Sequence, residues 1–241
     1  MKIYNNLYKK TKKECYSLIE KKLMNKEKTF IITANPETYM ISNKDSELKE
    51  IISNSDNIVV PDGIAVVKTA NYLGYNIKER ITGIELSQYL LEVANKNKYK
   101  VYLFGSTDEV ITRLKKLIEK EYANIKLVGA TNGYVEDKDS VMNNIKELSP
   151  DILMVALGIP LQEKIINKHI KDFKKGVFIG VGGSFDVISG IKKRAPRIFI
   201  KFNLEWLYRI LKEPKRIIKF IKYNITFVLI ILKEKTKKLK Q

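Results

Sequence analysis

Short apolar runs rich in Val and Ile alternate with longer amphipathic stretches over most of the chain, and this alternation constrains the fold more than any other feature. The runs expected to form strands are 29–33, 58–60, 101–105, 125–130, 152–156 and 177–181. The stretches 85–94, 107–122 and 162–170 carry apolar residues three and four positions apart, which is typical of helices. Such alternation predicts an α/β, Rossmann-like fold, a mostly parallel sheet flanked by helices with right-handed crossovers.

The unusual residues of the sequence directly follow these expected strands. They form the turns 33–37 (TANPE), 61–63 (PDG), 104–106 (FGS), 132–134 (NGY), 157–160 (LGIP) and 180–184 (GVGGS). Ligands of open α/β sheets bind beyond the carboxyl ends of the strands. We therefore expect one crevice that all of these turns line.

The composition changes after Gly190, where basic residues begin to alternate with aromatic ones. Of the net charge of +18, residues 192–241 contribute +13, from sixteen Lys and Arg against three Glu. The longest uncharged apolar run of this segment, 223–232, has ten residues, whereas a membrane-spanning helix needs about 20. We expect a Rossmann-like domain over 1–190 and, over 191–241, a basic, amphipathic helical appendage that lies on an anionic membrane surface without crossing it.

The beginning of the chain points to a reducing environment. Its first residues, MKIYNNLYKK, lack the apolar stretch of a secretory signal, and Cys15 is the single cysteine. We expect a cytoplasmic protein, attached peripherally to the inner face of the cell membrane. Cys15 follows a capping box formed by Thr11 and Glu14, within a helical pattern, so it is expected to be a buried structural thiol.

Two glycine turns have the form of a phosphate cradle. Gly105 and Ser106 precede one helix and Gly182 and Gly183 precede another, so backbone N–H groups can approach a diphosphate there. The alternative is that both are only tight turns from strand to helix. Neither turn completes the G-x-G-x-x-G fingerprint, and the sequence has no G-x-x-x-x-G-K-[ST] loop, which disfavours a dehydrogenase and a P-loop enzyme.

Asp62 is the acidic residue best placed for catalysis. It follows the strand 58–60, where a carboxylate can accept a proton from an attacking hydroxyl. The alternative is an N-cap for a helix over 63–70, and position alone favours that role. Arg80 is either a clamp for a leaving phosphate or an ordinary surface charge.

Gln162 and Glu163 lie in the first turn of the helix after Pro160. Gln162 can hydrogen-bond a sugar, but ordinary capping chemistry explains both residues equally well, because acidic side chains interact favourably with a helix N-terminus. His169 falls at the far end of this helix, and we expect it at the surface without a functional role.

A metal site has one candidate in the sequence. Asp137 and Asp139 form its only Asp-x-Asp, but acidic residues at that position also commonly begin a helix. We expect no metal and no other cofactor, with arginines and helix termini stabilising the diphosphate instead.

Taken together and in order, the motifs resemble the WecG/TagA/CpsF family of bacterial glycosyltransferases. The matching segments run from about Thr33 to about Phe220 and read TANPE, VVPDGI, ERITGIEL, YLFGS, NGY, ALGIPLQEK, GVGGSFDVISG, KRAP and LEWLYRILKEPKR. The resemblance implies transfer of an N-acetylmannosamine-type hexosyl unit from a UDP-sugar to a polyprenyl-diphosphate-linked GlcNAc, in the synthesis of teichoic acid or another surface polysaccharide.

The resemblance also assigns residues to roles. It implies an inverting reaction with Asp62 as the general base, which reverses the preference for the capping role, and it places Thr33, Asn35, Arg80 and Gln162 around the two substrates. The turns supply the remaining UDP-sugar-binding candidates, which are Gly63, Gly105, Ser106, Asn132, Gly133, Gly158, Pro160, Glu163, Gly182 and Gly183. The candidates for the acceptor diphosphate or the lipid surface are Arg194, Arg197, Arg209 and Arg216.

Two functions from other classes stay open at this level. A basic segment with interleaved aromatic residues also suits a nucleic acid, although that function leaves the polar turns unexplained. A non-catalytic membrane scaffold is the other alternative, against which the presence of Asp62 and Arg80 argues. We also expect self-association in solution, because a partner subunit can cover the apolar residues of the appendage.

Overall fold

The structure, a computed structural model, describes residues 2–238, with the side chains of all of these except 2, 3, 216, 219 and 234–238. Six strands form one sheet in the order β2-β1-β6-β5-β3-β4, and every pairing in it is parallel. The strands are β1 (Lys28–Ala34), β2 (Ile58–Pro61), β3 (Lys100–Gly105), β4 (Lys126–Thr131), β5 (Ile152–Ala156) and β6 (Gly176–Gly180). The predicted Rossmann-like sheet is confirmed, with each strand within one residue of its expected limits.

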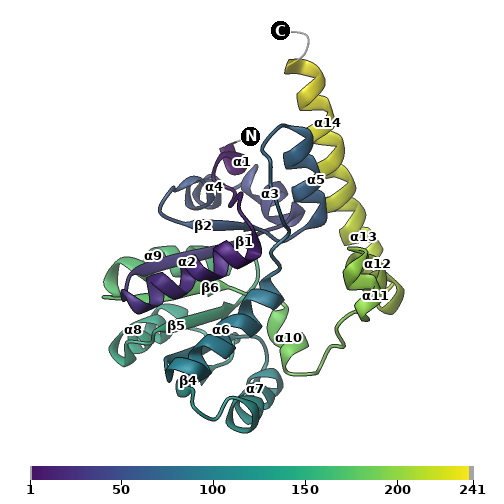
Figure 1. The fold of residues 1–241 in the computed structure, drawn as a ribbon. Coiled ribbons are helices and arrows are strands. Elements are labelled where there is room, and N and C mark those ends of the chain that lie inside the picture. The colour runs from purple at the N-terminus through teal and green to yellow at the C-terminus, as the bar shows by residue number, and fades with distance from the viewer. Residues whose placement is uncertain (1, 239–241) are drawn as a thin grey trace.

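Helices cover both faces of the sheet (Figure 1). On one face lie α2 (Lys12–Met24), α6 (Gly83–Asn97), α7 (Asp108–Glu121) and α10 (Ser184–Ile188). On the other lie α1 (Lys2–Asn5), α3 (Pro36–Ser42), α4 (Ser46–Ser53), α5 (Ile64–Tyr72), α8 (Lys138–Leu148), α9 (Leu161–His169) and the short 3-10 helix η1 (Ile170–Asp172). Both faces are covered because alternate strand residues point in opposite directions, as Ile31 and Ile32 do into two separate cores.

Helix α2 confirms two local predictions. Thr11 and Glu14 form the expected capping box at its N-terminus. Cys15 is fully buried, and burial raises the pKa of its thiol to about 12. It is therefore a structural residue of the core.

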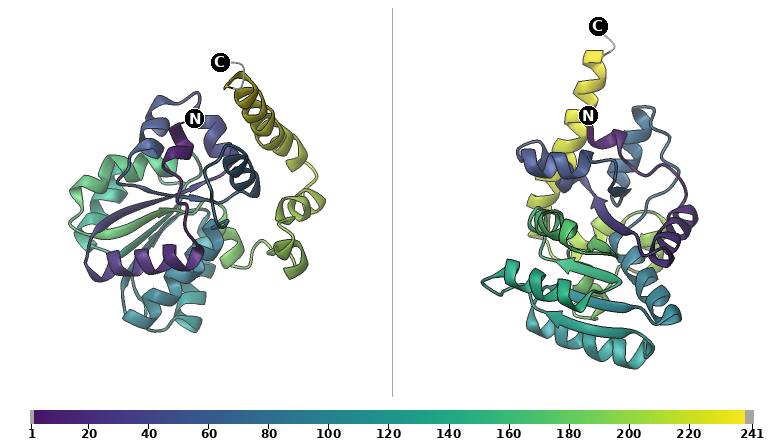
Figure 2. Two further views of the ribbon diagram at one scale, coloured as in Figure 1. Left: turned by 45° about the horizontal axis from the view of Figure 1, so that its top comes forward. Right: turned by 90° about the vertical axis from the view of Figure 1, so that its left-hand side faces the viewer.

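The C-terminal segment leaves the body of the protein after α10 and returns along one side of it (Figure 2). It contains α11 (Arg197–Lys201), α12 (Glu205–Lys212), α13 (Arg216–Phe220), the π-helical turn η2 (Ile221–Ile225) and α14 (Thr226–Lys238), and we call this segment, 197–238, the tail. Among residues 2–238, no helix has the length and apolarity that crossing a bilayer requires.

The tail is anchored to the body through α14. Phe227 and Ile231 are fully buried, and the ring of Phe227 packs edge-on against Tyr39 with centroids 4.9 Å apart. Helix α14 also contacts α3 and α5, which begin directly after β1 and β2. The tail is thus held beside the carboxyl end of the sheet.

Candidate active site

Asp62 stands at the carboxyl end of β2 and does not cap the following helix. Its backbone N–H donates to the carbonyl of Ala34, 2.9 Å away, which fixes it beside the end of β1. Gly63 is the N-cap residue of α5. The Asp62 carboxylate instead accepts a hydrogen bond from the backbone N–H of Gly83, at the start of α6. The capping alternative for Asp62 therefore fails, and its carboxylate is available to a site at the strand ends.

Gly83 marks the point where three strand ends converge. A Cβ at this position would lie 3.3 Å from Cγ2 of Thr33, 3.6 Å from Oδ2 of Asp62 and 3.6 Å from Oγ of Ser184. These three side chains come from the ends of β1, β2 and β6. Of the six turns predicted to line one crevice, those after β1, β2 and β6 thus meet around Asp62.

A cavity of about 260 Å³ opens beside Asp62, between the body and the tail. The body contributes Arg80 and the turns after β1 and β2, including Asn35 and Gly63, and the tail closes the opposite side. The full lining is Asn35, Pro36, Glu37, Asp62, Gly63, Ile64, Ala65, Arg80, Glu205, Trp206, Arg209, Ile210, Phe220, Tyr223 and Asn224. Asn35 also caps α3, since its side chain accepts from the Thr38 N–H at 3.0 Å.

Charges of both signs surround the Asp62 carboxylate. Burial raises its pKa above the ordinary value, while the positive charges of Arg209 and Arg80 and the Gly83 hydrogen bond act in the opposite direction. Arg80 forms an ion pair with Glu205 of the tail, with 2.5 Å between Nη2 and Oε2. The site therefore combines the Asp62 carboxylate with two arginines, one from the body, which is paired with Glu205, and one from the tail.

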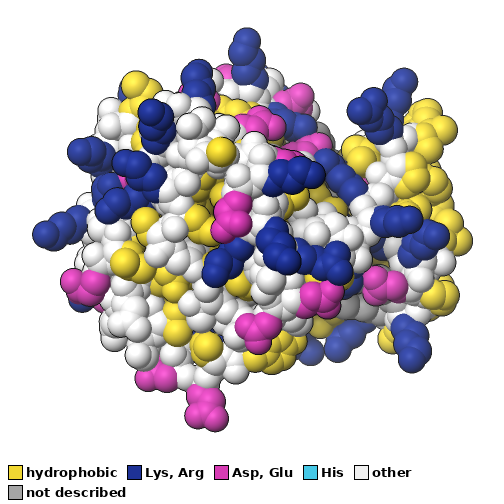
Figure 3. All heavy atoms as spheres, turned by 90° about the horizontal axis from the view of Figure 1, so that it is seen from below, with side chains coloured by type: hydrophobic (Ala, Val, Ile, Leu, Met, Phe, Trp, Pro, Cys, Tyr) yellow, Lys and Arg dark blue, Asp and Glu magenta, His cyan; other side chains and the backbone are white. Residues whose placement is uncertain are grey.

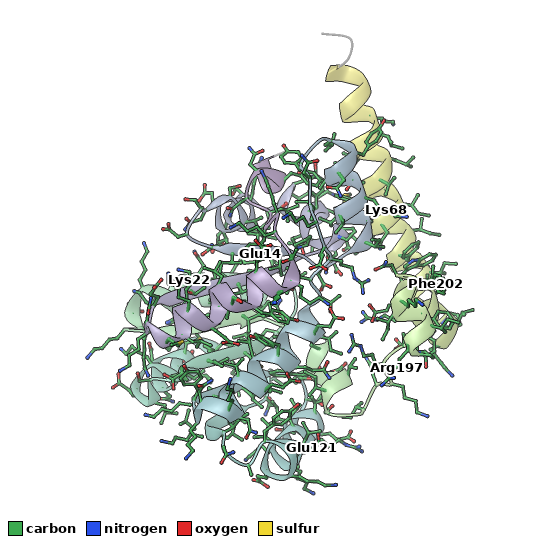
Figure 4. The ribbon with its side chains drawn as sticks, viewed as in Figure 1. Glu14, Lys22, Lys68, Glu121, Arg197 and Phe202 are labelled. Carbon is green, nitrogen blue, oxygen red and sulfur yellow. The ribbon has the colours of Figure 1, made fainter. Side chains whose placement is uncertain are left out.

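The four candidate arginines of the C-terminal segment lie in different places. Of the three whose side chains the structure describes, only Arg209 lines the cavity. Arg194 donates to Gln88 and Glu85 of α6, at 3.2 and 3.4 Å, and so ties the connection before the tail to the body. Arg197 is exposed at the start of α11 (Figure 4), and the side chain of Arg216 lies outside the described part of the structure.

The turns after β3 and β4 are joined by hydrogen bonds of their own. The N–H of Ser106 donates to the carbonyl of Ala156 at 2.9 Å, and the N–H of Gly133 donates to the carbonyl of Ser106 at 2.8 Å. Gly105 has a φ of +123°, and a Cβ there would lie 2.3 Å from the Ala156 oxygen, so only glycine fits. Because these amides already bond within the protein, they do not form a free cradle for phosphate.

Two acidic residues that the sequence did not single out accompany these turns. The Ser106 hydroxyl donates to Asp186 at 3.1 Å, and the Asn132 amide donates to Asp108 at 2.7 Å. Asp186 lies in the GVGGSFDVISG motif, and its place in that motif is the sequence feature that could have identified it as a site residue. Carboxylates at this edge can accept hydrogen bonds from hydroxyl groups of a ligand.

Gln162 and Glu163 are both buried, with 1% and 0% of their surface exposed. Pro160, not Gln162 or Glu163, is the N-cap residue of α9. The side-chain amide oxygen of Gln162 accepts hydrogen bonds from the backbone N–H groups of Gly158 and Gly182. The Gln162 amide nitrogen donates to Glu163 at 2.7 Å. Burial raises the pKa of Glu163 to about 7. Neither residue lines the cavity, and neither is a simple cap.

The expectation that His169 lies at the surface was wrong. It is 7% exposed, and its Nε2 lies 2.6 Å from the Asp139 carboxylate. The reason is a contact between helices, because Asp139 of α8 reaches across to the end of α9. Asp137 caps α8 through the N–H of Ser140, so the two acids of the Asp-x-Asp motif have separate structural roles.

The fold and the site together define an α/β protein with a cavity at the carboxyl end of a parallel sheet, and comparison with known proteins gives its family. A model described as the glycosyl transferase WecG/TagA/CpsF family matches residues 2–241. The chain therefore belongs to this family and is a glycosyltransferase, as its motifs predicted.

Individual relatives bear the name N-acetylglucosaminyldiphosphoundecaprenol N-acetyl-beta-D-mannosaminyltransferase. The protein of this name from Bacillus subtilis (strain 168) is 43% identical over 186 residues, which are 77% of this chain and 72% of the relative. The one from Staphylococcus aureus (strain MW2) is 41% identical over 189 residues, 78% of this chain and 74% of the relative. The similarity thus extends over most of both chains.

Proposed function

We propose that this enzyme transfers an N-acetylmannosamine-type hexosyl unit from a UDP-sugar to a GlcNAc that is linked through diphosphate to a polyprenol. The acceptor and the sugar follow the names of the relatives, and the UDP donor is our inference. The observation that carries the proposal is the enclosed Asp62 carboxylate in a cavity that Arg80 and Arg209 also line. Family membership weighs against the nucleic-acid alternative. Teichoic acid or another surface polysaccharide is the product class we infer.

In the proposed reaction, Asp62 is the general base. It accepts the proton of the acceptor hydroxyl, whose oxygen forms the new bond to the anomeric carbon while the bond from that carbon to the UDP oxygen breaks. Attack from the face opposite the leaving group inverts the anomeric centre, so no covalent enzyme intermediate is required. The raised pKa of Asp62 makes it a stronger proton acceptor than an exposed aspartate.

The arginines are proposed to stabilise the phosphates. Arg80 of the body and Arg209 of the tail both line the cavity, and a guanidinium can donate two parallel hydrogen bonds to a phosphate. We infer a metal-independent reaction, in which these fixed positive charges offset the negative charge that develops on the leaving diphosphate. Thr33 and Asn35 are proposed to border the reacting groups from the end of β1.

The tail is proposed to place the enzyme on the inner face of the cell membrane. Ile217, Ile221, Ile225, Leu229 and Leu232 are all at least 42% exposed and recur every three or four residues along α13, η2 and α14. We call them the apolar stripe. Hydrophobic side chains cover the outer side of the tail beside Lys and Arg (Figure 3). Such a helix can lie in the interface of an anionic bilayer, where the lipid-linked acceptor resides. In solution, the alternative is that a second copy of the protein covers the apolar stripe.

Release of UDP tests the proposed function. Purified enzyme is given a panel of UDP-sugars and a short-chain prenyl-diphosphate-GlcNAc, with and without EDTA, in parallel with Asp62→Asn. Acceptor-dependent release that resists EDTA and is lost in the variant is expected. Release that needs a divalent cation would overturn metal independence, and no release from any donor, with folded protein and anionic vesicles present, would favour the scaffold alternative.

A further inference from the structure

Two polar side chains are buried beneath the crevice without facing its cavity. Gln162 and Glu163, in the first turn of α9, are 1% and 0% exposed. A buried amide and a buried carboxyl are costly unless their hydrogen bonds are made, so their partners indicate what they do.

The Gln162 side chain joins two turns of the crevice. Its carbonyl oxygen accepts the N–H of Gly158, after β5, at 3.2 Å and the N–H of Gly182, after β6, at 3.1 Å. A Cβ on Gly180 would lie 2.6 Å from the Gln162 nitrogen, so the absence of a side chain there leaves room for the amide. Because one oxygen receives both N–H groups, the position of Gln162 sets the separation of the two turns.

Glu163 determines which way the Gln162 amide faces. The amide nitrogen donates to Oε1 of Glu163 at 2.7 Å, and Oε2 of Glu163 has no hydrogen-bond partner among the described residues. In the reversed orientation the amide NH₂ would face two N–H donors, and its oxygen would face the carboxyl oxygen. Glu163 thus favours the single orientation in which Gln162 can hold both turns.

The turn after β6 leads directly to the catalytic residues. Ser184 follows Gly182 by two positions, and its Oγ approaches the same point at Gly83 as Oδ2 of Asp62 and Cγ2 of Thr33. Thr33 also donates to the carbonyl of Gly180, at 3.3 Å. A shift of the turn would therefore change its distance from the proposed base.

We propose that Glu163 is a positioning residue for nucleoside-diphosphate binding: it orients Gln162, which holds the turns after β5 and β6 in the arrangement that receives the donor beside Asp62. This role rests on the proposed function for the identity of the ligand. In this role Glu163 makes no contact with substrate. The acceptor oxygen of Glu163 acts through Gln162, and the negative charge of Glu163 is not required.

Binding of UDP to the full chain, measured by titration calorimetry, tests this role without the transfer reaction. Glu163→Gln keeps an acceptor oxygen for Gln162, whereas Glu163→Leu removes it. Gln162→Leu removes the link itself, and Gly180→Ala displaces the Gln162 amide without altering either residue. Glu119→Gln, at an exposed position of α7, is the matched control for the change from acid to amide.

The expected pattern is a wild-type affinity within about threefold for Glu163→Gln and Glu119→Gln, and a loss of about tenfold, or 1.4 kcal/mol, for Glu163→Leu, Gln162→Leu and Gly180→Ala. The double variant Gln162→Leu with Glu163→Leu should bind UDP no more weakly than Gln162→Leu alone. Additive losses, equal losses in Glu163→Gln and Glu163→Leu, or unchanged affinity in Glu163→Leu would each overturn the role. Failure of the wild type to bind UDP would instead contradict the proposed donor.

Thermal unfolding of each variant separates this role from general stability. If Glu163→Leu did not fold, Gly180→Ala would still test the contact between Gln162 and Glu163, because its Cβ would lie 2.6 Å from the Gln162 nitrogen and 3.1 Å from Oε1 of Glu163. Lower melting temperatures with unchanged UDP affinity across these variants would show a purely structural role and overturn the proposal.

Discussion

Arg80 of the body and Glu205 of the tail form an ion pair, with 2.5 Å between Nη2 and Oε2 and with 13% and 10% of their side chains exposed. Both residues line the cavity that holds Asp62. Helix α12 carries Glu205 and also Arg209, whose positive charge acts on Asp62. The same contact therefore docks the tail and brings a second positive charge to the proposed base.

Removal of Glu205 should destabilise the protein strongly. Glu205→Ala leaves the Arg80 charge buried without its partner, and we expect a loss of about 3 kcal/mol in the free energy of unfolding. Glu119→Ala, at an exposed position of α7, is the control. Urea unfolding measures both. A combined Arg80→Leu and Glu205→Leu variant should recover part of the loss, and equal stability of Glu205→Ala and Glu119→Ala would contradict the importance of the pair.

The sequence predicted the elements of this site better than their contacts. The strand ends and the turns could be located because apolar runs and glycine-containing turns are local signals. The place of Asp62 after β2 favoured a capping role, and only the family resemblance implied that it is the general base. The ion pair joins residues 125 positions apart, and no local pattern indicates it. The burial of Gln162, Glu163 and His169 was missed for the same reason, since it depends on which elements cover the helix.

Asp62→Asn should abolish most of the transfer activity while leaving UDP binding intact. The amide has nearly the same shape but cannot accept the proton of the acceptor hydroxyl, and loss of a general base costs about 10²–10⁴-fold in rate. Single-turnover transfer measures the rate and calorimetry measures UDP affinity. Retention of more than about a tenth of the wild-type rate would show that another group accepts the proton.

The activity should rise with pH through the pKa of Asp62. Only the ionised carboxylate accepts a proton, and because burial raises this pKa, the rise should occur at higher pH than for an exposed aspartate. Arg209→Gln removes a positive charge that lowers the pKa, so the rise should move to still higher pH. The pH dependence of kcat/KM measures the shift separately from any loss of overall rate. An unchanged midpoint in Arg209→Gln would contradict the electrostatic coupling.

Glu163 should make the folded protein less stable as the solution becomes neutral. The pKa of Glu163 is raised from 4.5 to about 7 on folding. Below pH 4.5 the side chain is protonated in both states and does not lower the free energy of unfolding. Between pH 4.5 and 7 only the unfolded chain releases the proton, which favours unfolding. The loss should reach about 3 kcal/mol above pH 7. Glu163→Gln should unfold with a flatter pH dependence between pH 4.5 and 8 in urea titrations, and parallel curves for the two proteins would show that Glu163 titrates normally.

Substitutions on the two faces of α14 should separate docking of the tail on the body from binding of the tail to the membrane. Phe227 is fully buried against Tyr39, whereas Leu229, on the apolar stripe, is 53% exposed. Phe227→Ala should lower the free energy of unfolding by about 3–5 kcal/mol because it leaves a cavity, and it should lower activity by loosening the tail.

Leu229→Glu should leave the free energy of unfolding within about 0.5 kcal/mol of the wild type. It should weaken co-sedimentation with anionic vesicles, because the glutamate opposes insertion and is repelled by the negative surface. Met24→Glu, exposed on the body, is the control. Equal vesicle binding by all three variants would show that the stripe does not meet the membrane, and a concentration-dependent increase in mass that Leu229→Glu abolishes would assign it to contact between subunits.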